Sequence, residues 1–408
     1  MPDWETLYYG EPLEIVSGSG SRVTDAAGRS YLDFFCGILT NMLGYDVPEV
    51  REAVERQLRT GVMHTSTLYL IRNQIELAEK IARLSGIPGA KVFFTNSGTE
   101  ANETALLLAT AARRSSQVLA LRGSYHGRSF GAVAITGNTA WKSSQLAPFG
   151  VHYLHGTDRE LPAFAGMSDE EYTAAAPDVA CLIAEPIQGV GGFTMPPDGL
   201  LGAYKEVLDE RGILLISDEV QTGWGRTGEH FWGIGAHGVV PDMMTFAKGL
   251  GNGFAIGGVV ARGDLMDGLA GNGISTFGGN PLATAAASAT VDYVVSHDLQ
   301  RNAATTGNMI ISGLRDAAGP LATVGEVRGK GLMFAADLVD PATRAPSPAL
   351  AARVLEAARE RGLLIGKGGL YGNALRMAPP LTLTDAEAKE GLGLLTDALR
   401  AVDEEATR

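Results

Sequence analysis

Two side chains that suit one kind of chemistry each follow an apolar run. Asp218 follows Ile213-Leu-Leu-Ile-Ser, and Lys248, thirty residues later, follows Met243-Met-Thr-Phe-Ala and opens a glycine-rich segment. A lysine amine can form a Schiff base with an aldehyde, and a carboxylate can keep a pyridine nitrogen protonated. Burial beside an apolar strand lowers the pKa of a lysine and leaves its amine nucleophilic. The pair therefore indicates chemistry on a pyridine ring that also carries an aldehyde.

Another apolar run, Lys91-Val-Phe-Phe-Thr95, leads into a helix start that could bind phosphate. Ser97 and Glu100 have the spacing of a capping box, in which each side chain accepts a backbone hydrogen bond from the other residue. Gly98 lets a ligand approach the backbone closely, and the free N–H groups of a helix N-terminus attract anions. Taken alone, an ordinary helix cap is the simpler explanation of this segment.

Two further runs lead to polar side chains. Val118-Leu-Ala-Leu121 leads to Tyr125, whose ring could stack on a flat cofactor, although a structural turn also explains a Tyr-His-Gly sequence. Val179-Ala-Cys-Leu-Ile-Ala184 leads to Glu185, a carboxylate that needs a partner if it is buried and is otherwise a surface acid. Gln221 could donate a hydrogen bond to a ring oxygen.

These groups follow runs that are apolar at most positions, which is typical of parallel strands buried on both faces. The carboxyl ends of parallel strands meet at one edge of a sheet, where open α/β sheets bind ligands. A phosphate cradle, a stacking aromatic ring, a carboxylate and a lysine at one edge together predict pyridoxal 5'-phosphate as the cofactor. No Gly-x-Gly-x-x-Gly sequence follows the first strand of a βαβ unit, which disfavours a dinucleotide dehydrogenase.

The elements that must position these groups alternate along the chain from about residue 91. Short apolar runs, the last of them Gly257-Gly-Val-Val-Ala261, alternate with helical stretches, which predicts an α/β domain with a mostly parallel central sheet flanked by helices. After about residue 300, paired strands and helices indicate a smaller α+β domain. We expect an N-terminal segment over residues 1–50 that belongs to the small domain, a large cofactor-binding domain over residues 51–298 and a C-terminal small domain over residues 299–408.

The composition is that of a globular protein that binds neither nucleic acid nor a membrane. The 408 residues are 45% hydrophobic and carry a net charge of -13, without a long basic run. The N-terminus lacks the pattern of a signal peptide. Cys36 and Cys181 lie in apolar surroundings, which favours free thiols in a reducing compartment and therefore the cytoplasm. His152 and His155 have no third ligand nearby in sequence, so we expect no metal site.

Several short motifs match one known family, in its order and over nearly the whole chain. They are Asn96-Ser-Gly-Thr-Glu-Ala-Asn102, Ser124-Tyr-His-Gly127, Glu185-Pro-Ile-Gln188, Asp218-Glu-Val-Gln-Thr-Gly223, Lys248-Gly249, Ser275-Thr-Phe-Gly-Gly-Asn-Pro281 and Leu375-Arg-Met-Ala-Pro-Pro-Leu381. With these motifs the chain resembles the class III aminotransferases of the fold-type I group of pyridoxal phosphate enzymes. That group includes acetylornithine, ornithine, 4-aminobutyrate and alanine–glyoxylate aminotransferases.

The resemblance implies that Lys248 forms the Schiff base and that Asp218 pairs with the pyridine nitrogen. It implies a set of cofactor contacts, namely Ser97, Gly98, Thr99, Tyr125, His126, Glu185, Asp218, Val220, Gln221, Lys248 and Thr276. Thr276 would reach the cofactor phosphate of the neighbouring subunit, so a homodimer or larger assembly with shared active sites is expected. Arg376 would hold the substrate's α-carboxylate in its guanidinium fork.

The implied reaction is a ping-pong transamination. An amino acid or ω-amine donor would give its amino group to a 2-oxo acid such as pyruvate, 2-oxoglutarate or glyoxylate. Lys248 would move a proton between donor carbon and cofactor. An aminomutase, a decarboxylating transaminase or a phospho-lyase would use the same lysine and aspartate. A catalytically idle structural or binding protein is a further alternative, which the intact Lys248 and Asp218 argue against.

One region departs from the family. The family often reads Gly-His-x-His-Pro where this chain reads Gly44-Tyr-Asp-Val-Pro48, and the preceding Cys36-Gly-Ile-Leu-Thr40 is expected to border the substrate pocket. These differences leave the identity of the donor open. In some family members a glutamate at the position of Glu185 neutralises the carboxylate-binding arginine. Glu185 and Arg376 are therefore candidates for a switch between α- and ω-amine donors.

Overall fold

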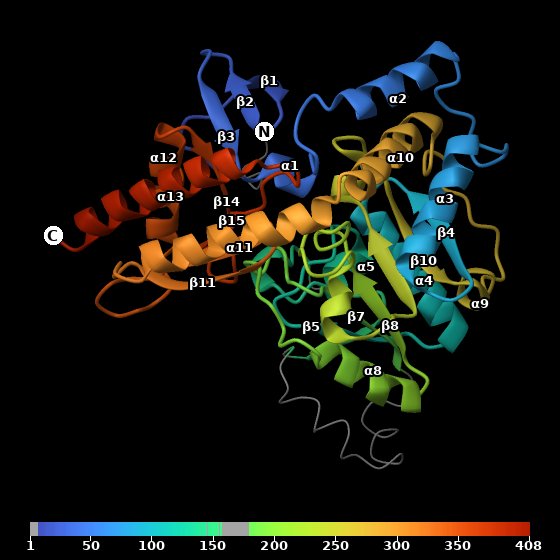
Figure 1. Ribbon diagram of the computed structural model, residues 1–408. Helices are drawn as coiled ribbons and strands as arrows, with labels where there is room; N and C mark the ends of the chain where they lie inside the picture. The colour runs from blue at the N-terminus through green and yellow to red at the C-terminus, as the bar shows by residue number, and fades with distance from the viewer. Residues whose placement is uncertain (1–6, 145, 155, 157–178) are drawn as a thin grey trace.

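The computed structural model describes residues 7–144, 146–154, 156 and 179–408. Within these residues the strands form three sheets, one of seven strands and two of four (Figure 1). The seven-stranded sheet lies centrally in the part of the chain between about residues 90 and 262. The two smaller sheets are built from the N-terminal strands and the last hundred residues.

The central sheet is mostly parallel, as predicted. In spatial order its strands are β4 (Ala90–Thr95), β10 (Gly257–Arg262), β9 (Met243–Phe246), β8 (Leu214–Asp218), β7 (Val179–Ala184), β5 (Gln117–Leu121) and β6 (Gly150–Leu154). Strand β10 runs antiparallel to both of its neighbours, and the other paired strands are parallel. Strands β4, β5, β7, β8 and β9 therefore share one carboxyl edge.

Helices cover both faces of this sheet. Helices α4 (Gly98–Arg113) and α5 (Phe130–Ile135) pack on one face, and α8 (Leu200–Glu210) and α10 (Pro281–Ser296) pack on the other. Every residue of β7 is buried because the strand has apolar neighbours on both sides. The remaining elements of this part are α2 (Pro48–Arg59), α3 (Arg72–Ser85), α9 (Gly263–Met266), η1 (Thr139–Trp141), η2 (Gly233–His237) and η3 (Lys248–Gly251).

The two ends of the chain meet in the smaller sheets. One sheet has the order β1 (Ile15–Ser19), β2 (Arg22–Asp25), β3 (Ser30–Asp33) and β13 (Leu363–Leu364), and the other has β11 (Val324–Lys330), β12 (Met333–Leu338), β15 (Ala374–Met377) and β14 (Gly366–Gly368). Strand β3 pairs in parallel with β13, so the N-terminal segment is part of the same sheet as a C-terminal strand. The domain boundaries near residues 50 and 298 stay a prediction.

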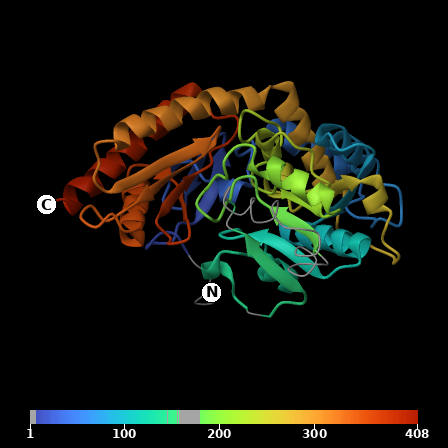
Figure 2. The same cartoon turned by 90° about the horizontal axis from the view of Figure 1, so that it is seen from below.

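Long helices support these sheets. They are α11 (Leu299–Ala318), α12 (Pro348–Glu360) and α13 (Asp385–Ala406). Figure 2 shows α11 lying across the sheet that contains β11 and β12. Helix α13 begins with a capping box formed by Thr384 and Glu387. A short element labelled α1 (Cys36–Leu39) connects the N-terminal strands to the central part.

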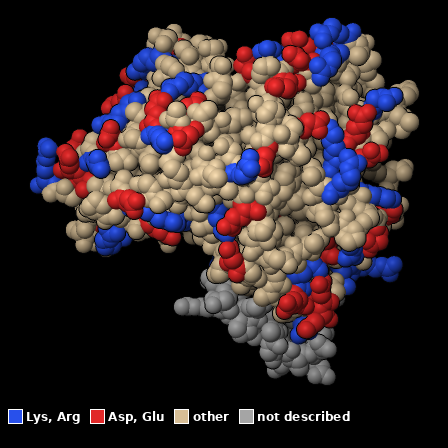
Figure 3. Space-filling view, viewed as in Figure 1, with Lys and Arg blue, Asp and Glu red and all other residues tan. Residues whose placement is uncertain are grey.

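The surface and the thiols agree with an ordinary globular chain. Cys36 and Cys181 are buried and free. Lysine and arginine side chains are interspersed with aspartate and glutamate over the described residues on the face in Figure 3. In the part of the chain that the structure describes, no helix combines the length and the apolar character needed to cross a membrane.

Candidate active site

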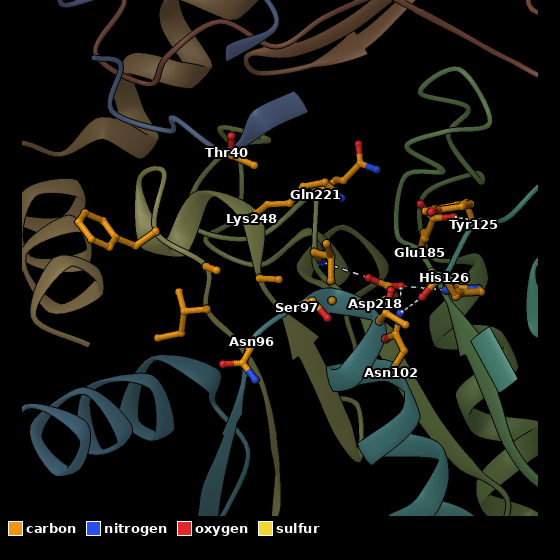
Figure 4. A pocket seen from close by; sticks show the side chains of 18 of the residues that line it. Thr40, Asn96, Ser97, Asn102, Tyr125, His126, Glu185, Asp218, Gln221 and Lys248 are labelled. Carbon is orange, nitrogen blue, oxygen red and sulfur yellow. Dashed lines mark hydrogen bonds and ion pairs between the residues drawn. The ribbon is translucent and has the colours of Figure 1, made fainter. Parts of the chain in front are cut away.

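A cavity of about 410 Å³ lies at the carboxyl edge of the central sheet (Figure 4). It brings together most of the residues predicted from the sequence, which are Ser97, Gly98, Thr99, Tyr125, His126, Glu185, Asp218, Val220, Gln221 and Lys248. Thr40, from the segment expected to border the substrate pocket, lines it as well. Thr276 and Arg376 are not among its lining residues.

Lys248 reaches the cavity from a strained backbone position. It is the first residue of η3, two residues after the end of β9, and its φ is +42°. Left-handed backbone is uncommon for a residue with a Cβ and often marks a functional site. Removal from water lowers the pKa of Lys248, and this effect outweighs the opposite effect of the nearby Asp218 and Glu185 carboxylates. A larger fraction of its amine is therefore neutral and nucleophilic at neutral pH.

Asp218, at the end of β8, is held by donors on both oxygens. Its Oδ2 accepts a hydrogen bond from Asn102 Nδ2 at 2.8 Å and lies 2.8 Å from His126 Nδ1. Its Oδ1 accepts from the Val220 N–H at 3.1 Å. The hydroxyl of Thr245 donates to Asn102 Oδ1 at 2.7 Å, which fixes the orientation of the amide. This network holds the Asp218 carboxylate in one orientation.

Roles for Asn102 and Thr245 were not predicted from the sequence. Asn102 is the last residue of the motif that begins at Asn96. A usable signal was its position four residues after Gly98, since side chains at i and i+4 lie on the same face of a helix. The helix face that begins at Gly98, where phosphate binding is expected, therefore also carries Asn102, which reaches the Asp218 carboxylate.

The first turn of α4 lies at the cavity, where an anion site is expected from the sequence. Ser97 caps the helix, and its hydroxyl accepts from the Glu100 N–H at 3.2 Å. The Glu100 carboxylate accepts from the Asn96 N–H at 2.7 Å rather than from Ser97, so only half of the predicted capping box is present. A Cβ added to Gly98 would lie 3.0 Å from a methyl group of Val220. The segment therefore presents bare backbone to the cavity.

Glu185 follows β7 and is buried. Its Oε1 accepts from the Tyr125 N–H at 2.9 Å, and its Oε2 accepts from the Gly189 N–H at 2.8 Å. Burial raises the pKa of Glu185 to about 7, and the nearby Asp218 adds to this, although both backbone hydrogen bonds oppose it. The surface location that the sequence left open is therefore excluded for Glu185.

Arg376 lies on β15 and is 2% exposed. Its Nη1 donates to the Gly189 carbonyl at 2.9 Å, and its Nε and Nη2 donate to the Lys367 carbonyl at 3.2 and 3.0 Å. The guanidinium also lies over the ring of Phe35, 5.1 Å from its centroid. Glu185 and Arg376, both described, form no ion pair, and Gly189 contacts each of them through its backbone. The guanidinium has no carboxylate partner among the described residues.

The lining suits a flat polar ligand with an anionic group. Gln221 Oε1 and His126 Nε2 are buried and have no hydrogen-bond partner among the described residues. The Tyr125 ring stands beside the cavity, in edge contact with Trp141 at a centroid distance of 5.5 Å. The first residues of α4 and Asp218 both line the cavity. These features fit pyridoxal phosphate, the cofactor expected from the sequence.

Two other predicted features lie away from this cavity. Thr276 is exposed, between Ile274 and Phe277, which are also exposed. His152 lies 3.0 Å from the side chain of Gln117, and His155 lies outside the described residues. Among the described residues, no cluster of three or more histidine, cysteine or acidic side chains could hold a metal ion.

Known proteins resemble the chain over nearly its full length. Residues 9–399 match the family model described as Aminotransferase class-III. Acetylornithine aminotransferase of Mycolicibacterium smegmatis is 39% identical and covers 98% of this chain and 98% of its own. An amine transaminase from an uncultivated Pseudomonas species, solved in its PLP-bound form, is 32% identical, with a TM-score of 0.88 and coverage of 100% and 98%. A phospholyase from Arthrobacter, solved with phosphoethanolamine, is 34% identical, with a TM-score of 0.86 and coverage of 98% and 97%.

Proposed function

Because the chain belongs to the class-III aminotransferases, we propose that its cavity transfers an amino group from an amino acid or ω-amine donor to a 2-oxo acid held by Arg376. The family makes the protein a pyridoxal-phosphate-dependent aminotransferase of fold type I, acting on amino donors and 2-oxo acids. The observation that carries the assignment of roles is that Lys248, with its lowered pKa, shares one cavity with Asp218.

Lys248 and Asp218 perform the central roles. Bound pyridoxal phosphate supplies an aldehyde that can link to an amine and a ring that accepts electron density. Lys248 would hold that aldehyde through its amine and would accept and return a proton at Nζ. Asp218 would hold the ring nitrogen protonated, with its carboxylate oriented by Asn102 and His126 at Oδ2 and by the Val220 N–H at Oδ1. A charge-assisted hydrogen bond of this kind is stronger than a neutral one.

The remaining lining residues hold the two ends of the cofactor. Ser97, Gly98 and Thr99 bind the phosphate with the N–H groups and hydroxyls at the start of α4, where the helix dipole favours an anion. Tyr125 covers one face of the ring. Gln221 contacts the ring hydroxyl, a role that suits its buried and unpartnered Oε1. His126 and Val220 support the ring position through their bonds to Asp218.

Arg376 is the group that selects a carboxylate. Its guanidinium donates to neutral acceptors, the carbonyls of Gly189 and Lys367 and the Tyr8 hydroxyl, so its positive charge is available to a carboxylate ligand. It lies close enough to Lys248 to lower the pKa of that lysine. The proposed switch between α- and ω-amine donors through Glu185 would require a rearrangement around Gly189, whose backbone separates the two side chains.

We propose a cytoplasmic homodimer with shared active sites. Exposed apolar side chains at Ile274 and Phe277 flank Thr276, and Leu68, Tyr69 and Leu70 are exposed as well, which supports burial against a second copy. Thr276 would then reach the partner's cofactor phosphate. Light scattering should give twice the mass of one chain or a larger even multiple. The buried free cysteines are compatible with a reducing compartment.

The test of the function is a spectrum as well as a rate. Purified wild-type protein with pyridoxal phosphate should show a lysine-dependent absorbance band that an amine donor bleaches and a 2-oxo acid restores. Lys248→Ala should lose the band and turnover while it still binds pyridoxamine phosphate. A matrix of donors and acceptors, read by this band, identifies the substrates. Retained turnover in Lys248→Ala, or release of CO2 or phosphate in place of an oxo product, would overturn the proposal.

A further inference from the structure

The element labelled α1 is not a right-handed helix. Its four residues, Cys36–Leu39, have φ angles of 49°, 63°, 65° and 63°, and the ψ angles of Gly37 and Ile38 are 35° and 56°. The N–H groups of its last residue and of the next residue donate to carbonyls four positions earlier, at 2.9 and 3.0 Å. These are the dihedrals and bonds of one turn of a left-handed α-helix. We call Cys36–Leu39 the left-handed turn.

This conformation is unfavourable for the residues that adopt it. In left-handed helical backbone the Cβ atom crowds the following carbonyl oxygen, and residues other than glycine enter it singly rather than in a row. Three of the four residues here carry a Cβ, and Ile38 is β-branched. The Ile38 side chain is 47% exposed, so its own packing compensates little. Contacts from the surrounding structure must therefore hold the turn.

Asp33 supplies these contacts. Its carboxyl group is buried, and its Oδ1 accepts from the N–H groups of Phe35 and Cys36 at 2.8 and 2.9 Å. Its Oδ2 accepts from the hydroxyl of Tyr45 at 2.7 Å. Tyr45 stands where the family often has the first histidine of Gly-His-x-His-Pro. Asp33 therefore fixes the start of the left-handed turn and ties it to the chain that leaves the turn.

The far end of the turn meets the lysine side of the active site. Thr40, the next residue, lines the cavity. A Cβ on Gly249, the residue after Lys248, would lie 2.9 Å from Met42 Cβ and 3.3 Å from the Leu39 carbonyl oxygen. The turn and the segment after it therefore pack directly on the backbone that carries the lysine. Figure 4 shows Thr40 and Lys248 in the same part of the view, apart from Asp218.

The start of the turn meets the arginine side. The Ala378 N–H donates to the Phe34 carbonyl at 2.6 Å, just after β15. The Phe35 ring lies 5.1 Å from the guanidinium carbon of Arg376. The left-handed turn thus lies between the two side chains that are proposed to act on the substrate, the lysine amine and the carboxylate-binding arginine.

We propose that Asp33 is a positioning residue of the active site: by holding the left-handed turn, it sets the placement of Thr40 and of the Lys248 backbone relative to Arg376. The substrate-side consequence rests on the proposed roles of Lys248 and Arg376. Loss of Asp33 releases the turn toward ordinary backbone angles, and the cavity wall formed by Thr40 moves with it.

The chain contains a matched control for this idea. Asp25, in the same sheet, accepts from the N–H groups of Ala27 and Arg29 at 3.0 and 2.9 Å and from the Tyr31 hydroxyl at 2.8 Å. Asp33 and Asp25 thus each accept from two backbone N–H groups and one tyrosine hydroxyl, and both are buried. Asp25 also forms an ion pair with Arg29 at 3.4 Å. Neither residue lines the cavity, and only Asp33 contacts the left-handed turn. A purely structural role for both residues predicts equal effects.

The first experiment compares Asp33→Ala with Asp25→Ala. Three quantities are measured: the melting temperature, the dissociation constant of pyridoxamine phosphate from the apo-protein, and KM for the 2-oxo acid. We expect similar losses of melting temperature in the two variants. Asp33→Ala should weaken cofactor binding and raise KM by about tenfold each, since the three hydrogen bonds that hold the left-handed turn beside Thr40 and Lys248 are lost. Asp25→Ala should change both constants by less than about twofold. Equal effects in the two variants would overturn the proposal.

The second experiment tests whether strain is the cause. Glycine adopts left-handed backbone freely, whereas alanine does not. Compared with Asp33→Ala alone, the double variant with Ile38→Gly should have a dissociation constant for pyridoxamine phosphate and a KM that are each at least about threefold lower. The double variant with Ile38→Ala should show neither decrease. Equal recovery in the two double variants would refute the role of strain.

If Asp33→Ala does not fold, Tyr45→Phe is a milder variant. It removes only the hydroxyl that donates to Asp33, and Tyr31→Phe is its counterpart at Asp25. We expect Tyr45→Phe to raise KM by about threefold and Tyr31→Phe to leave KM unchanged. Equal KM values in these two variants would again refute the proposal. The binding of pyridoxamine phosphate does not depend on turnover. A failure of the proposed reaction in wild-type protein is therefore distinguishable from a failure of this inference.

Discussion

Arg376 should be needed for the oxo acid and not for an amine that lacks a carboxylate. The structure contains two buried arginines in one sheet with different partners. Arg328 on β11 donates to both carboxylate oxygens of Asp337, each at 2.8 Å. Arg376 donates to carbonyl oxygens and to the Tyr8 hydroxyl. A guanidinium fork without its own acid is suited to take the carboxylate of a ligand.

The size of the effect follows from these contacts. Arg376→Met removes two charge-assisted hydrogen bonds to a bound carboxylate, each worth about 1.5 to 3 kcal/mol. The lower end of this range gives about 3 kcal/mol, or about a hundredfold in kcat/KM for the 2-oxo acid. The free energy of unfolding should change by less than this, because methionine replaces a buried cation that has no acid partner. The carbonyls of Gly189 and Lys367 lose donors, which limits this compensation.

The assay separates the two half-reactions. Bleaching of the cofactor band by an amine without a carboxylate measures the first, and recovery of the band with a 2-oxo acid measures the second. We expect Arg376→Met to slow only the second. Arg328→Met is the control and should lower stability without this asymmetry, because removal of one partner from a buried ion pair is destabilising. An equal loss with both substrates, or a loss below about threefold for the oxo acid, would refute the assignment of Arg376.

Two further predictions concern the carboxylate and the phosphate end of the cavity. Burial raises the pKa of Glu185 from 4.5 to about 7, so this residue favours the folded state only while it is protonated. Its contribution is complete below about pH 4.5 and is lost as the pH rises through about 7. Urea titrations should therefore show that the free energy of unfolding falls less between about pH 5 and 8 in Glu185→Gln than in wild type, and parallel curves would contradict the burial argument. Gly98→Ala places a Cβ 3.0 Å from Val220 and should weaken pyridoxamine phosphate binding by about tenfold, measured by calorimetry. Gly393→Ala is its control, since the added Cβ meets nothing within 4 Å in α13, and equal affinities in the two variants would show that Gly98 does not form the cradle.

The parallel core could be predicted because its signal is local. Runs such as Val179–Ala184 are apolar at every position, and only a strand covered on both faces tolerates that pattern. The direction of β10 could not be predicted, because a strand buried on both faces has the same composition whether it runs parallel or antiparallel. Its direction depends on the connections before and after it, and these are glycine-rich and irregular on the β9 side.

The gathering of residues in one cavity could be predicted where a polar group stands at the end of a strand or just beyond it, as at Asp218 and Lys248. Asn102 and Thr245 were missed because their importance comes from a contact between a helix and two strands that are far apart in sequence. The left-handed turn was missed for a different reason. Local preferences assign Ile38 to extended or right-handed backbone, and only long-range contacts such as those of Asp33 and Tyr45 override them. Thr276 stays a prediction.

The charges around the cavity follow one physical rule. Burial lowers the pKa of Lys248 and raises that of Glu185, so both groups move toward their neutral forms near neutral pH. Asp218 has donors on both oxygens, and the guanidinium of Arg376 donates to neutral acceptors. The Asp218 carboxylate and the Arg376 guanidinium are thus placed where ligands would bring the opposite charge, at the ring nitrogen and at the substrate carboxylate. The lowered pKa of Lys248 favours its neutral amine, and the raised pKa of Glu185 weakens its competition with the substrate for Arg376.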